Sequence, residues 1–361
     1  MEKIIKLNKT KSHELVVYFQ EPAVKLKAIV AIHNTNRGPA IGGTRLWPYP
    51  SFNGALNDAL NLSRAMTYKT AASDLNFGGG KAVIWLDPKN KSAKLFRAYG
   101  ECLKALEGKF YTGEDANISM SDIREIIKTA PYSIAGKPKD LSGGGDTALP
   151  TAKGILYGIR ACLDFTKIKN SNNLTIAIHG VGKVGYALAQ LLSREKNRPK
   201  IIVADIRHDL AERAGRLFKA EVISPEKIHK IKCDVYSPCV TLGGILNKKT
   251  TQELRCKIVA GATNNQLLNP LSDSRRLLRR GIIYAPDYVI NAGGVINVAH
   301  ELHPLGYSRK NVEKELEKIY HRIYQIIYLS KKNNITTKEV ADAIAESKIF
   351  AGSSKACSFK P

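Results

Sequence analysis

The stretch that decides the fold is Leu174-Thr175-Ile176-Ala177-Ile178-His179-Gly180-Val181-Gly182-Lys183-Val184-Gly185. Its first half is an apolar run that predicts a buried strand. The pattern Gly-x-Gly-x-x-Gly follows at once, and residues 186–192 predict a helix. In this context the first glycine makes the turn, the second leaves room for a pyrophosphate, and the third lets the helix pack on the strand. The stretch therefore predicts a dinucleotide-binding βαβ unit.

A second predicted strand, residues 200–204, ends at Asp205. This carboxylate follows the third glycine of the motif by about 20 residues, the spacing typical of dinucleotide-binding folds. A carboxylate at this position binds the ribose hydroxyls of the adenosine and repels a 2′-phosphate. We therefore predict NAD rather than NADP. Arg207 and His208 follow closely and can accommodate a phosphate, so NADP stays open as a second cofactor.

Three further predicted strands continue this half of the chain, at 233–236, 257–260 and 282–284. Two of the segments behind them contain glycines and side-chain amides, namely 261–265 with Asn264 and 291–294 with Asn291. Ligands of parallel sheets bind at the carboxyl ends of the strands. We therefore expect these amides to bond the nicotinamide carboxamide or a ribose.

The N-terminal part of the chain contains a second notable stretch, Gly78-Gly79-Gly80-Lys81. We interpret its glycines as an open corner in which the lysine stands at the entry to a strand. A predicted helix, 52–68, places Lys69 at a helix C-terminus, and Asp115 follows a predicted strand at 110–112. Two amines and a carboxylate beside glycines predict a site for a small zwitterion or a 2-oxo acid.

The order of predicted elements divides the chain in two. Strands and helices alternate up to about residue 140, and the glycine-rich segment 141–146 then interrupts the pattern. A chain of 361 residues is long enough for two domains with separate cores. We predict an α/β protein with domain boundaries at 1–145 and 146–330.

Composition limits the class of protein. With 43% hydrophobic residues and no run of about 18 apolar residues, the chain is expected to be globular, without a transmembrane helix. The N-terminus shows no signal peptide, so a cytoplasmic location is predicted. The six cysteines form no Cys-x-x-Cys pair, which favours reduced thiols. The net charge of +24 is spread along the chain, which is typical of a lysine-rich surface. A non-catalytic NAD-binding or nucleic-acid-binding protein remains as a distant alternative.

Two other kinds of chemistry find no support in the sequence. His300 and His303 are three residues apart, whereas the zinc-protease helix needs histidines four apart, so no metal site is predicted. A Gly-x-Ser-x-Gly pattern is absent from the sequence, which disfavours a serine nucleophile on an α/β-hydrolase fold.

Several long motifs occur in a fixed order along the chain. They are Gly-Pro-Ala-Ile-Gly-Gly-Thr-Arg (38–45), Met-Thr-Tyr-Lys (66–69), Gly-Gly-Gly-Lys (78–81), Gly-Glu-Asp (113–115), Asn-Asn-Gln (264–266) and Ala-Pro-Asp-Tyr-Val-Ile-Asn-Ala-Gly-Gly-Val (285–295). With these motifs, the chain resembles the Glu/Leu/Phe/Val amino-acid dehydrogenase family, and within it the leucine and phenylalanine dehydrogenase branch. The resemblance extends from about residue 15 to about residue 350.

The resemblance implies reversible oxidative deamination of an L-amino acid to a 2-oxo acid and ammonia, with NAD. It implies two domains with an active-site cleft between them. The N-terminal domain would bind substrate and make subunit contacts, the other would be a Rossmann-type NAD-binding domain, and a C-terminal helix at about 330–350 would return to the first. Members of the family form homo-oligomers, from dimers to octamers.

The resemblance also implies roles for individual residues. Lys69 would bind the substrate carboxylate, Lys81 would activate the water that attacks the imine, and Asp115 would pass protons to and from the substrate nitrogen. The remaining residues would lie beside substrate (Gly42, Gly43), beside nicotinamide (Thr151, Asn264) and along the pocket for the substrate side chain (Ile41, Gly113, Val295, Val298).

The substrate stays open between two types. Leucine dehydrogenases usually have alanine at the position of Gly113, whereas phenylalanine and tryptophan dehydrogenases usually have glycine, so a missing methyl group here favours a larger side chain. The segment 145–150 also lacks the family's usual paired prolines. We expect a leucine dehydrogenase type of activity, with the phenylalanine or tryptophan type as the alternative. Glutamate is disfavoured because the pocket positions carry no additional lysine.

Overall fold

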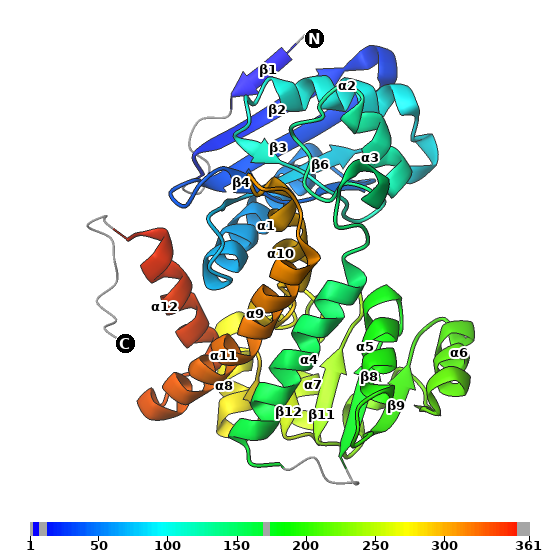
Figure 1. Ribbon diagram of the computed structural model, residues 1–361, viewed down its shortest axis with the longest axis vertical. Coiled ribbons are helices and arrows are strands. Elements are labelled where there is room, and N and C mark those ends of the chain that lie inside the picture. The colour runs from blue at the N-terminus through cyan, green and yellow to red at the C-terminus, as the bar shows by residue number, and fades with distance from the viewer. Residues whose placement is uncertain (1–2, 7–12, 169–173, 352–361) are drawn as a thin grey trace. The chain divides into compact units, whose positions relative to one another are not determined.

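The computed structural model in Figure 1 describes residues 3–6, 13–168 and 174–351. Its contacts divide the chain into two compact units. Unit 1 contains the described residues up to Asp146, residues 297–309 and residues 345–351; unit 2 contains the described residues of 147–296 and residues 310–344. The C-terminal helix that was expected at about 330–350 to return to the first domain groups with unit 2 up to Ile344 and with unit 1 from Ala345. The expected boundaries, 1–145 and 146–330, also differ from this division at 297–309. That segment groups with unit 1, where Glu301 bonds the backbone of residues 136–144.

Unit 1 is built on a mixed sheet. Its strands, in spatial order, are β1 (Lys3–Lys6), β2 (Leu15–Glu21), β3 (Leu26–Asn34), β6 (Gly78–Trp85), β4 (Ala40–Ile41) and β7 (Phe110–Tyr111), and β5 (Thr44–Trp47) also pairs with β6. The pairs from β1 to β6 are antiparallel, and β4 and β5 pair with β6 in parallel. The central strand β6 therefore has β3 along one edge and both β4 and β5 along the other.

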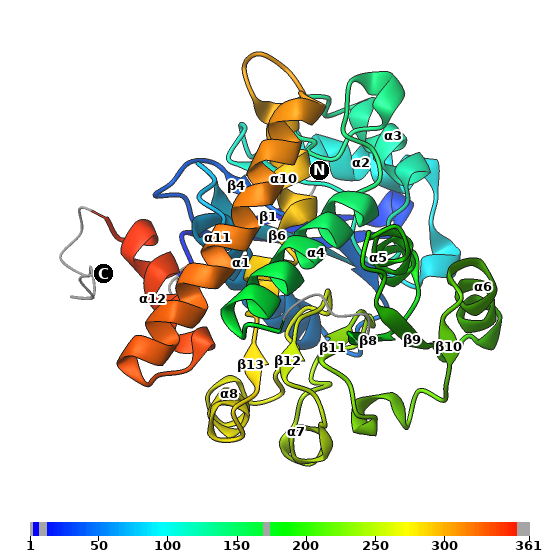
Figure 2. The same cartoon turned by 60° about the horizontal axis from the view of Figure 1, so that its bottom comes forward.

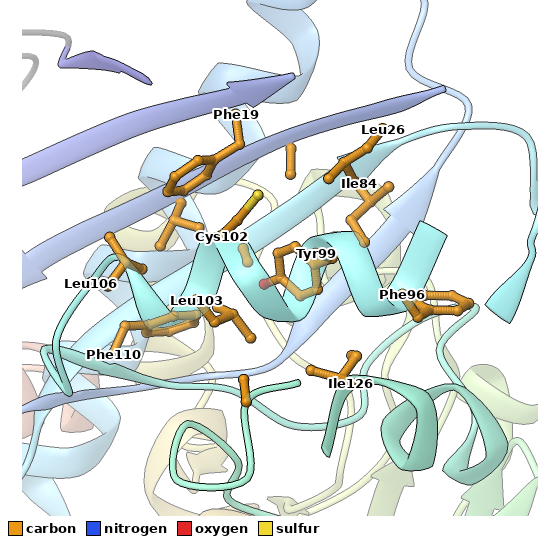
Figure 3. Packing of buried hydrophobic residues seen from close by; sticks show 14 of the residues in the cluster. Phe19, Leu26, Ile84, Phe96, Tyr99, Cys102, Leu103, Leu106, Phe110 and Ile126 are labelled. Carbon is orange, nitrogen blue, oxygen red and sulfur yellow. The ribbon is translucent and has the colours of Figure 1, made fainter. Parts of the chain in front are cut away.

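Helices cover both faces of this sheet. Ala82 and Ile84 point toward α2 (Ala93–Lys104) and α3 (Met120–Ile127), in the core that Figure 3 shows around Phe96 and Tyr99. Val83 packs on the other face with residues of α1 (Phe52–Ala72). Since alternate residues of a strand point to opposite faces, Lys81 shares the face of Val83 and α1. The short 3-10 helices of unit 1 are η1 (Pro22–Val24), η2 (Pro88–Asn90), η3 (Lys139–Leu141) and η5 (His300–Leu302).

Unit 2 contains a sheet whose described strand pairs are all parallel. Its spatial order, visible from end to end in Figure 2, is β10 (Glu221–Val222), β9 (Lys200–Ala204), β8 (Thr175–His179), β11 (Val235–Pro238), β12 (Ile258–Val259) and β13 (Ile283–Tyr284). Numbered along the chain, this is the order 3-2-1-4-5-6 of the doubly wound dinucleotide-binding fold. The predicted Rossmann-type architecture is confirmed.

The remaining helices follow from Thr147 onward. They are α4 (Ala148–Phe165), α5 (Lys183–Ser193), α6 (His208–Phe218), η4 (Ile228–Lys230), α7 (Lys248–Glu253), α8 (Pro270–Arg279), α9 (Asp287–Ile290), α10 (Gly293–Ala299), α11 (Arg309–Asn333) and α12 (Thr337–Ile349). Helix α4 begins three residues before the expected Thr151 and has Pro150 in its first turn. Proline is tolerated there because the N–H groups of a first turn make no hydrogen bond within the helix. In the described part of the chain, no helix combines the length and apolar character needed to cross a membrane.

Candidate active site

The candidate chemistry of unit 1 centres on an ion pair between Lys81 and Asp115. The Lys81 ammonium lies on β6 with its side chain 8% exposed, and its Nζ donates to Oδ2 of Asp115. Asp115 follows Glu114, which bridges to Thr44 at the start of β5. The structure therefore brings together two predicted residues, one on a strand of the sheet and the other in the segment that follows β7.

Arg45 is a second cation at the same carboxylate, and sequence reasoning had assigned it no role. Its Nε lies 3.5 Å from Oδ2 of Asp115, and its Nη1 lies 3.1 Å from Oδ2 of Asp58. The Tyr49 hydroxyl donates to that same Asp58 oxygen at 2.5 Å. Arg45 pairs in register with Val83, which places it on the face of the sheet that carries Lys81.

The charges around Asp115 determine its protonation. Burial alone raises the pKa of this carboxyl, but the nearby charges of Lys81 and Arg45 outweigh burial and hold the pKa below its usual range. Asp115 is therefore ionised at neutral pH. An ionised carboxylate beside two cations can accept a proton from a substrate ammonium group.

Lys69 lies in the last turn of α1, as expected. The partial negative charge at a helix C-terminus favours a protonated amine. Because α1 packs on the face of the sheet that carries Lys81, the two lysines lie on the same side of the sheet. This arrangement suits the binding of an anion such as a substrate carboxylate.

The three glycines at 78–80 do not form the expected open corner. They belong to strand β6, and protein atoms occupy the space beside them. A Cβ at Gly79 would lie 2.0 Å from the backbone nitrogen of Thr67, and one at Gly80 would lie 2.7 Å from the Phe110 ring. The glycines therefore let α1 and β7 approach the strand closely, and the interpretation of an open corner is wrong.

Gly42 and Gly43 separate β4 from β5, next to the ion pair. A Cβ at Gly42 would lie 1.9 Å from the carbonyl oxygen of Gly80. A Cβ at Gly43 would lie 3.0 Å from Cβ of Asp115. Both glycines are thus needed for close backbone packing, and Gly43 borders the carboxylate directly.

Two of the residues predicted to line the side-chain pocket lie close together within unit 1. Gly113 and Val298 are neighbours across Gly136, since a Cβ on Gly136 would lie 3.4 Å from Cγ1 of Val298 and 3.9 Å from Cα of Gly113. Ile41 is buried on β4, beside Gly42. Val295 lies on α10 within unit 2.

Gly113 has a different role from the expected one. A methyl group there would point at the carbonyl oxygen of Ala135, at 2.2 Å. The space that the missing methyl leaves is therefore occupied by backbone. This weakens the argument that Gly113 makes room for a larger substrate.

The glycines in the turn of unit 2 differ in the space around them. Gly180 has φ +94°, and a Cβ at Gly185 would lie 1.9 Å from the Gly180 carbonyl oxygen, so both positions are closed to larger residues. At Gly182 no described atom lies within 4 Å of an added Cβ. Gly182 is also the N-cap of α5, where Lys183 and Val184 begin the helix. The N–H groups in the first turn of a helix have no partner within the helix, so a helix N-terminus with open space beside it suits a pyrophosphate.

Asp205 stands beside this turn, at the end of β9. Its Oδ2 accepts a hydrogen bond from the backbone N–H of Val181 at 2.7 Å, and its Oδ1 accepts one from Arg207 at 2.9 Å. An ionised carboxylate has about four acceptor positions, so both oxygens keep capacity for ribose hydroxyls. The predicted acid and the predicted turn are thus joined by a direct hydrogen bond.

Asn264 and Asn291 also meet. The Asn291 side chain donates to Oδ1 of Asn264 at 2.8 Å and to the carbonyl of Ala262 at 2.9 Å. Its own Oδ1 is buried and accepts no hydrogen bond among the described residues. An orphaned acceptor of this kind fits the amide hydrogens of a carboxamide.

Thr151 lies beside the glycines that follow Asn291 in the chain. Its hydroxyl would be 3.0 Å from a Cβ at Gly294, and the hydroxyl donates to the Thr147 carbonyl at 2.8 Å. The segment 291–294 is a junction between α9 and α10 and not the expected loop behind a strand. The close approach of Gly293 and Gly294 to the first turn of α4 explains why these positions are glycines.

Within residues 3–6, 13–168 and 174–351, no group of three or more His, Cys, Asp or Glu side chains is arranged to hold a metal ion. His300 and His303 stack with ring centroids 6.5 Å apart, at a 3-10 turn. The cysteines in the described ranges are free thiols: Cys102, Cys162, Cys233, Cys239 and Cys256.

Comparison with known proteins gives a consistent result. Residues 13–131 match the family model "Glu/Leu/Phe/Val dehydrogenase, dimerisation domain", and residues 196–355 match "Glutamate/Leucine/Phenylalanine/Valine dehydrogenase". A leucine dehydrogenase of Geobacillus stearothermophilus is 41% identical over 96% of this chain and 93% of the relative. A phenylalanine dehydrogenase of Bacillus thermotolerans is 42% identical over 97% and 92%.

A solved structure adds a third substrate type. The crystal structure of L-tryptophan dehydrogenase from Nostoc punctiforme is similar with a TM-score of 0.80 at 40% identity. The match covers 94% of this chain and 96% of that one. Proteins named for three different amino acids are thus about equally similar to this chain.

Proposed function

Because this chain belongs to the Glu/Leu/Phe/Val dehydrogenase family, we propose that it oxidises a hydrophobic L-amino acid with NAD. It is an oxidoreductase of the amino-acid dehydrogenase class. In the proposed reaction, amino acid, NAD⁺ and water give 2-oxo acid, ammonium, NADH and a proton. The ion pair of Lys81 with Asp115, reinforced by Arg45, is the observation that carries this proposal.

Three charged side chains of the candidate site in unit 1 have proposed tasks. Lys69 binds the substrate carboxylate, for which a protonated amine at a helix C-terminus is suited. Asp115 is ionised and takes a proton from the substrate ammonium group. Lys81 then releases its proton to solvent, and the neutral amine removes one from the water that attacks the substrate carbon. Asp115 gives its proton to the leaving nitrogen, and the hydroxyl proton of the adduct completes the ammonium ion. Release of ammonium returns both groups to their starting charges.

The cofactor proposal rests on unit 2. NAD, when bound, supplies the hydride acceptor. The open space at Gly182 and the N-terminus of α5 suit its pyrophosphate, the Asp205 carboxylate suits its adenosine ribose, and the orphaned Oδ1 of Asn291 suits its carboxamide. Asn264 holds the Asn291 amide, and Thr151 lies beside Gly294 in the same part of the unit. Arg207, bonded to Asp205 through its N–H, leaves NADP as the second candidate.

For the substrate we propose the leucine type first and the aromatic type second. The backbone carbonyl of Ala135 occupies the direction of a methyl group at Gly113, so the glycine gives little reason to expect a larger pocket. Relatives named for leucine, phenylalanine and tryptophan are similar to nearly the same degree, 41% and 42%. Ile41, Val295 and Val298 are apolar, which disfavours glutamate.

A substrate panel tests this proposal. Purified protein is given NAD at alkaline pH with leucine, valine, isoleucine, phenylalanine, tryptophan or glutamate, and NADH formation is followed. We expect turnover with the aliphatic amino acids, slower turnover with the aromatic ones and none with glutamate. NADP replaces NAD in a parallel series. Absence of NADH with every amino acid would refute the dehydrogenase, and salt-dependent binding of nucleic acid without turnover would favour the distant alternative.

We further propose that the chain forms a homo-oligomer. Residues 13–131 match a model described as a dimerisation domain. Light scattering coupled to size-exclusion chromatography should give a mass that is a multiple of 39.7 kDa, and a monomer at micromolar concentration would contradict the proposal. The cytoplasmic location stays a prediction.

A further inference from the structure

Glu301 makes an unusual set of contacts within unit 1. Its Oε2 accepts hydrogen bonds from the backbone N–H groups of Gly136 and Lys137, each at 2.8 Å, and its Oε1 accepts one from Gly144 at 2.7 Å. Burial raises the pKa of this carboxyl, whereas the same backbone N–H groups oppose the rise. One side chain thus holds a backbone segment that lies far from it in the sequence.

That segment forms a layer between Gly113 and Val298. The N–H of Ala135 donates to the carbonyl of Thr112 at 2.7 Å, and the Ala135 carbonyl fills the space beside Gly113. The next residue, Gly136, is in contact range of Val298. Residues 135 and 136 are therefore the link between two predicted walls of the substrate pocket.

The segment that contains Glu301 also contains Val298. The segment also has an internal hydrogen bond, in which the Tyr307 hydroxyl donates to Oδ1 of Asn297 at 2.8 Å. Asn297 approaches Gly144, where a Cβ would lie 2.3 Å from its Nδ2. The Glu301 carboxylate thus bonds 297–307 to 136–144, Asn297 packs closely against Gly144, and Val298 lies next to Gly136.

We propose that Glu301 is a positioning residue that fixes the pocket wall formed by Gly113, Gly136 and Val298, and thereby sets which amino-acid side chain fits. This inference rests on the proposed function. Glu301 acts through the backbone N–H groups that it binds. A shift of this wall changes the room available to a substrate side chain, and one methylene group in an apolar pocket is worth about 10- to 200-fold in specificity.

The test compares substrate discrimination in matched variants. Glu301→Gln keeps the size of the side chain but replaces one acceptor oxygen with an NH₂ group, which cannot accept from the backbone N–H groups. Glu301→Asp keeps the charge but shortens the reach. Glu101→Gln, at an exposed glutamate of α2 that pairs with Lys104, is the control. For each protein kcat/KM is measured with leucine and with phenylalanine, together with the melting temperature and the Kd for NAD.

We expect the ratio of the two kcat/KM values to move toward one by about tenfold in Glu301→Gln, and in the same direction in Glu301→Asp. The control should keep the ratio of the wild type, and all three variants should keep its Kd for NAD. An equal loss with both substrates, or an unchanged ratio, would overturn the positioning role. If Glu301→Gln does not fold, the ratio in Glu301→Asp decides in the same way.

The wild type separates this proposal from the one on which it rests. A wild type that oxidises neither leucine nor any other amino acid refutes the proposed function, and the role of Glu301 falls with it. An active wild type whose discrimination survives both substitutions overturns the role of Glu301 alone.

Discussion

The two units handle their candidate ligands by different physical means. In unit 1, Lys81 and Arg45 converge on one oxygen of Asp115, so the site consists of charged side chains. In unit 2, the candidate contacts are the N-terminus of α5, the Asp205 carboxylate and side-chain amides. The substrate nitrogen changes its charge and bonding in the proposed reaction, which calls for titratable groups. A dinucleotide brings its own hydride chemistry, so the protein around it supplies hydrogen-bond partners that bind and orient it.

The glycines of the two candidate sites also differ. In unit 1 the glycines at 78–80 and Gly42 have protein atoms where a side chain would lie. In unit 2, Gly182 has open space beside it, although Gly185 in the same motif is filled. A glycine-rich sequence therefore marks either close packing or access for a ligand, and only the neighbouring atoms tell which.

The largest effect is expected from Lys81→Ala. Removal of the amine should lower kcat by about 10³-fold, within the range for loss of a general base. Alanine has no group that could take a proton from the attacking water. The Kd for NAD, measured by fluorescence titration, should stay within about twofold of the wild type, since the glycine turn of the other unit is untouched. Lys104→Ala, at an exposed lysine, is the control. Loss of NAD binding in Lys81→Ala would break the proposed division of labour.

The next largest effect concerns two glycines of one motif. Gly182→Ala should raise the Kd for NAD by about tenfold or more and leave the melting temperature unchanged, because the new methyl group meets only the space proposed for pyrophosphate. Gly185→Ala should instead destabilise the fold by about 1–3 kcal/mol, because its methyl group would meet the Gly180 carbonyl oxygen. Calorimetry and NAD titration distinguish the two outcomes. Equal stability losses in both variants would show that Gly182 is also a packing residue.

Acid stability should respond equally in both units. Burial lowers the pKa of His33 to about 4, with His13 and Arg64 adding to the effect, and burial lowers that of His179 to about 4, with His229 adding. The unfolded chain takes up these protons first, since an exposed histidine has a pKa of about 6.5. Stability is therefore lost as pH falls from about 6.5 to about 4, by about 2 kcal/mol for each histidine at pH 5.

Two substitutions test whether these histidines cause the loss of stability at acid pH. His33→Asn and His179→Asn remove the titrating ring, and the asparagine oxygen can replace Nδ1, which contacts Thr67 and Tyr236 respectively. Urea unfolding at pH 7 and pH 5 should show a smaller loss in each variant than in the wild type. A wild type as stable at pH 5 as at pH 7 would contradict the buried neutral histidines.

The smallest effect is expected from Arg45→Gln. Burial, Lys81 and Arg45 together set the pKa of Asp115, and loss of the guanidinium should raise it. The acid limb of the pH–rate profile should then move to higher pH, and Arg45→Lys should move it less because the charge is kept. An unmoved acid limb in Arg45→Gln would exclude Arg45 from the control of Asp115.

Sequence could predict most of unit 2. The apolar strand, the glycine turn and the spaced Asp205 are local features, and local features determine this part of the fold. The structure places Val181 and Asp205 in one hydrogen bond, as the motif implies. Motif resemblance also named both members of the ion pair between Lys81 and Asp115.

What sequence could not predict depends on tertiary neighbours. Arg45 joins the site because β5 pairs with β6 in a register that puts it beside Val83, and register is not readable from a four-residue strand. The interpretation of an open corner at 78–80 was wrong for the same reason, and the argument for a larger pocket at Gly113 was weakened. Whether a missing Cβ leaves space depends on atoms such as those of Thr67 and Ala135, which come from distant segments.

The most direct test of the central claim is the transfer of deuterium from substrate to cofactor. Purified protein is incubated with NAD and the amino acid that the panel selects, labelled with deuterium at its α-carbon, and the products are measured by mass spectrometry. We expect one deuterium on each NADH, with 2-oxo acid and ammonia formed in equal amounts. A 2-oxo acid that appears without deuterium on NADH, or NADH that appears without ammonia, would contradict NAD-linked oxidative deamination by this protein.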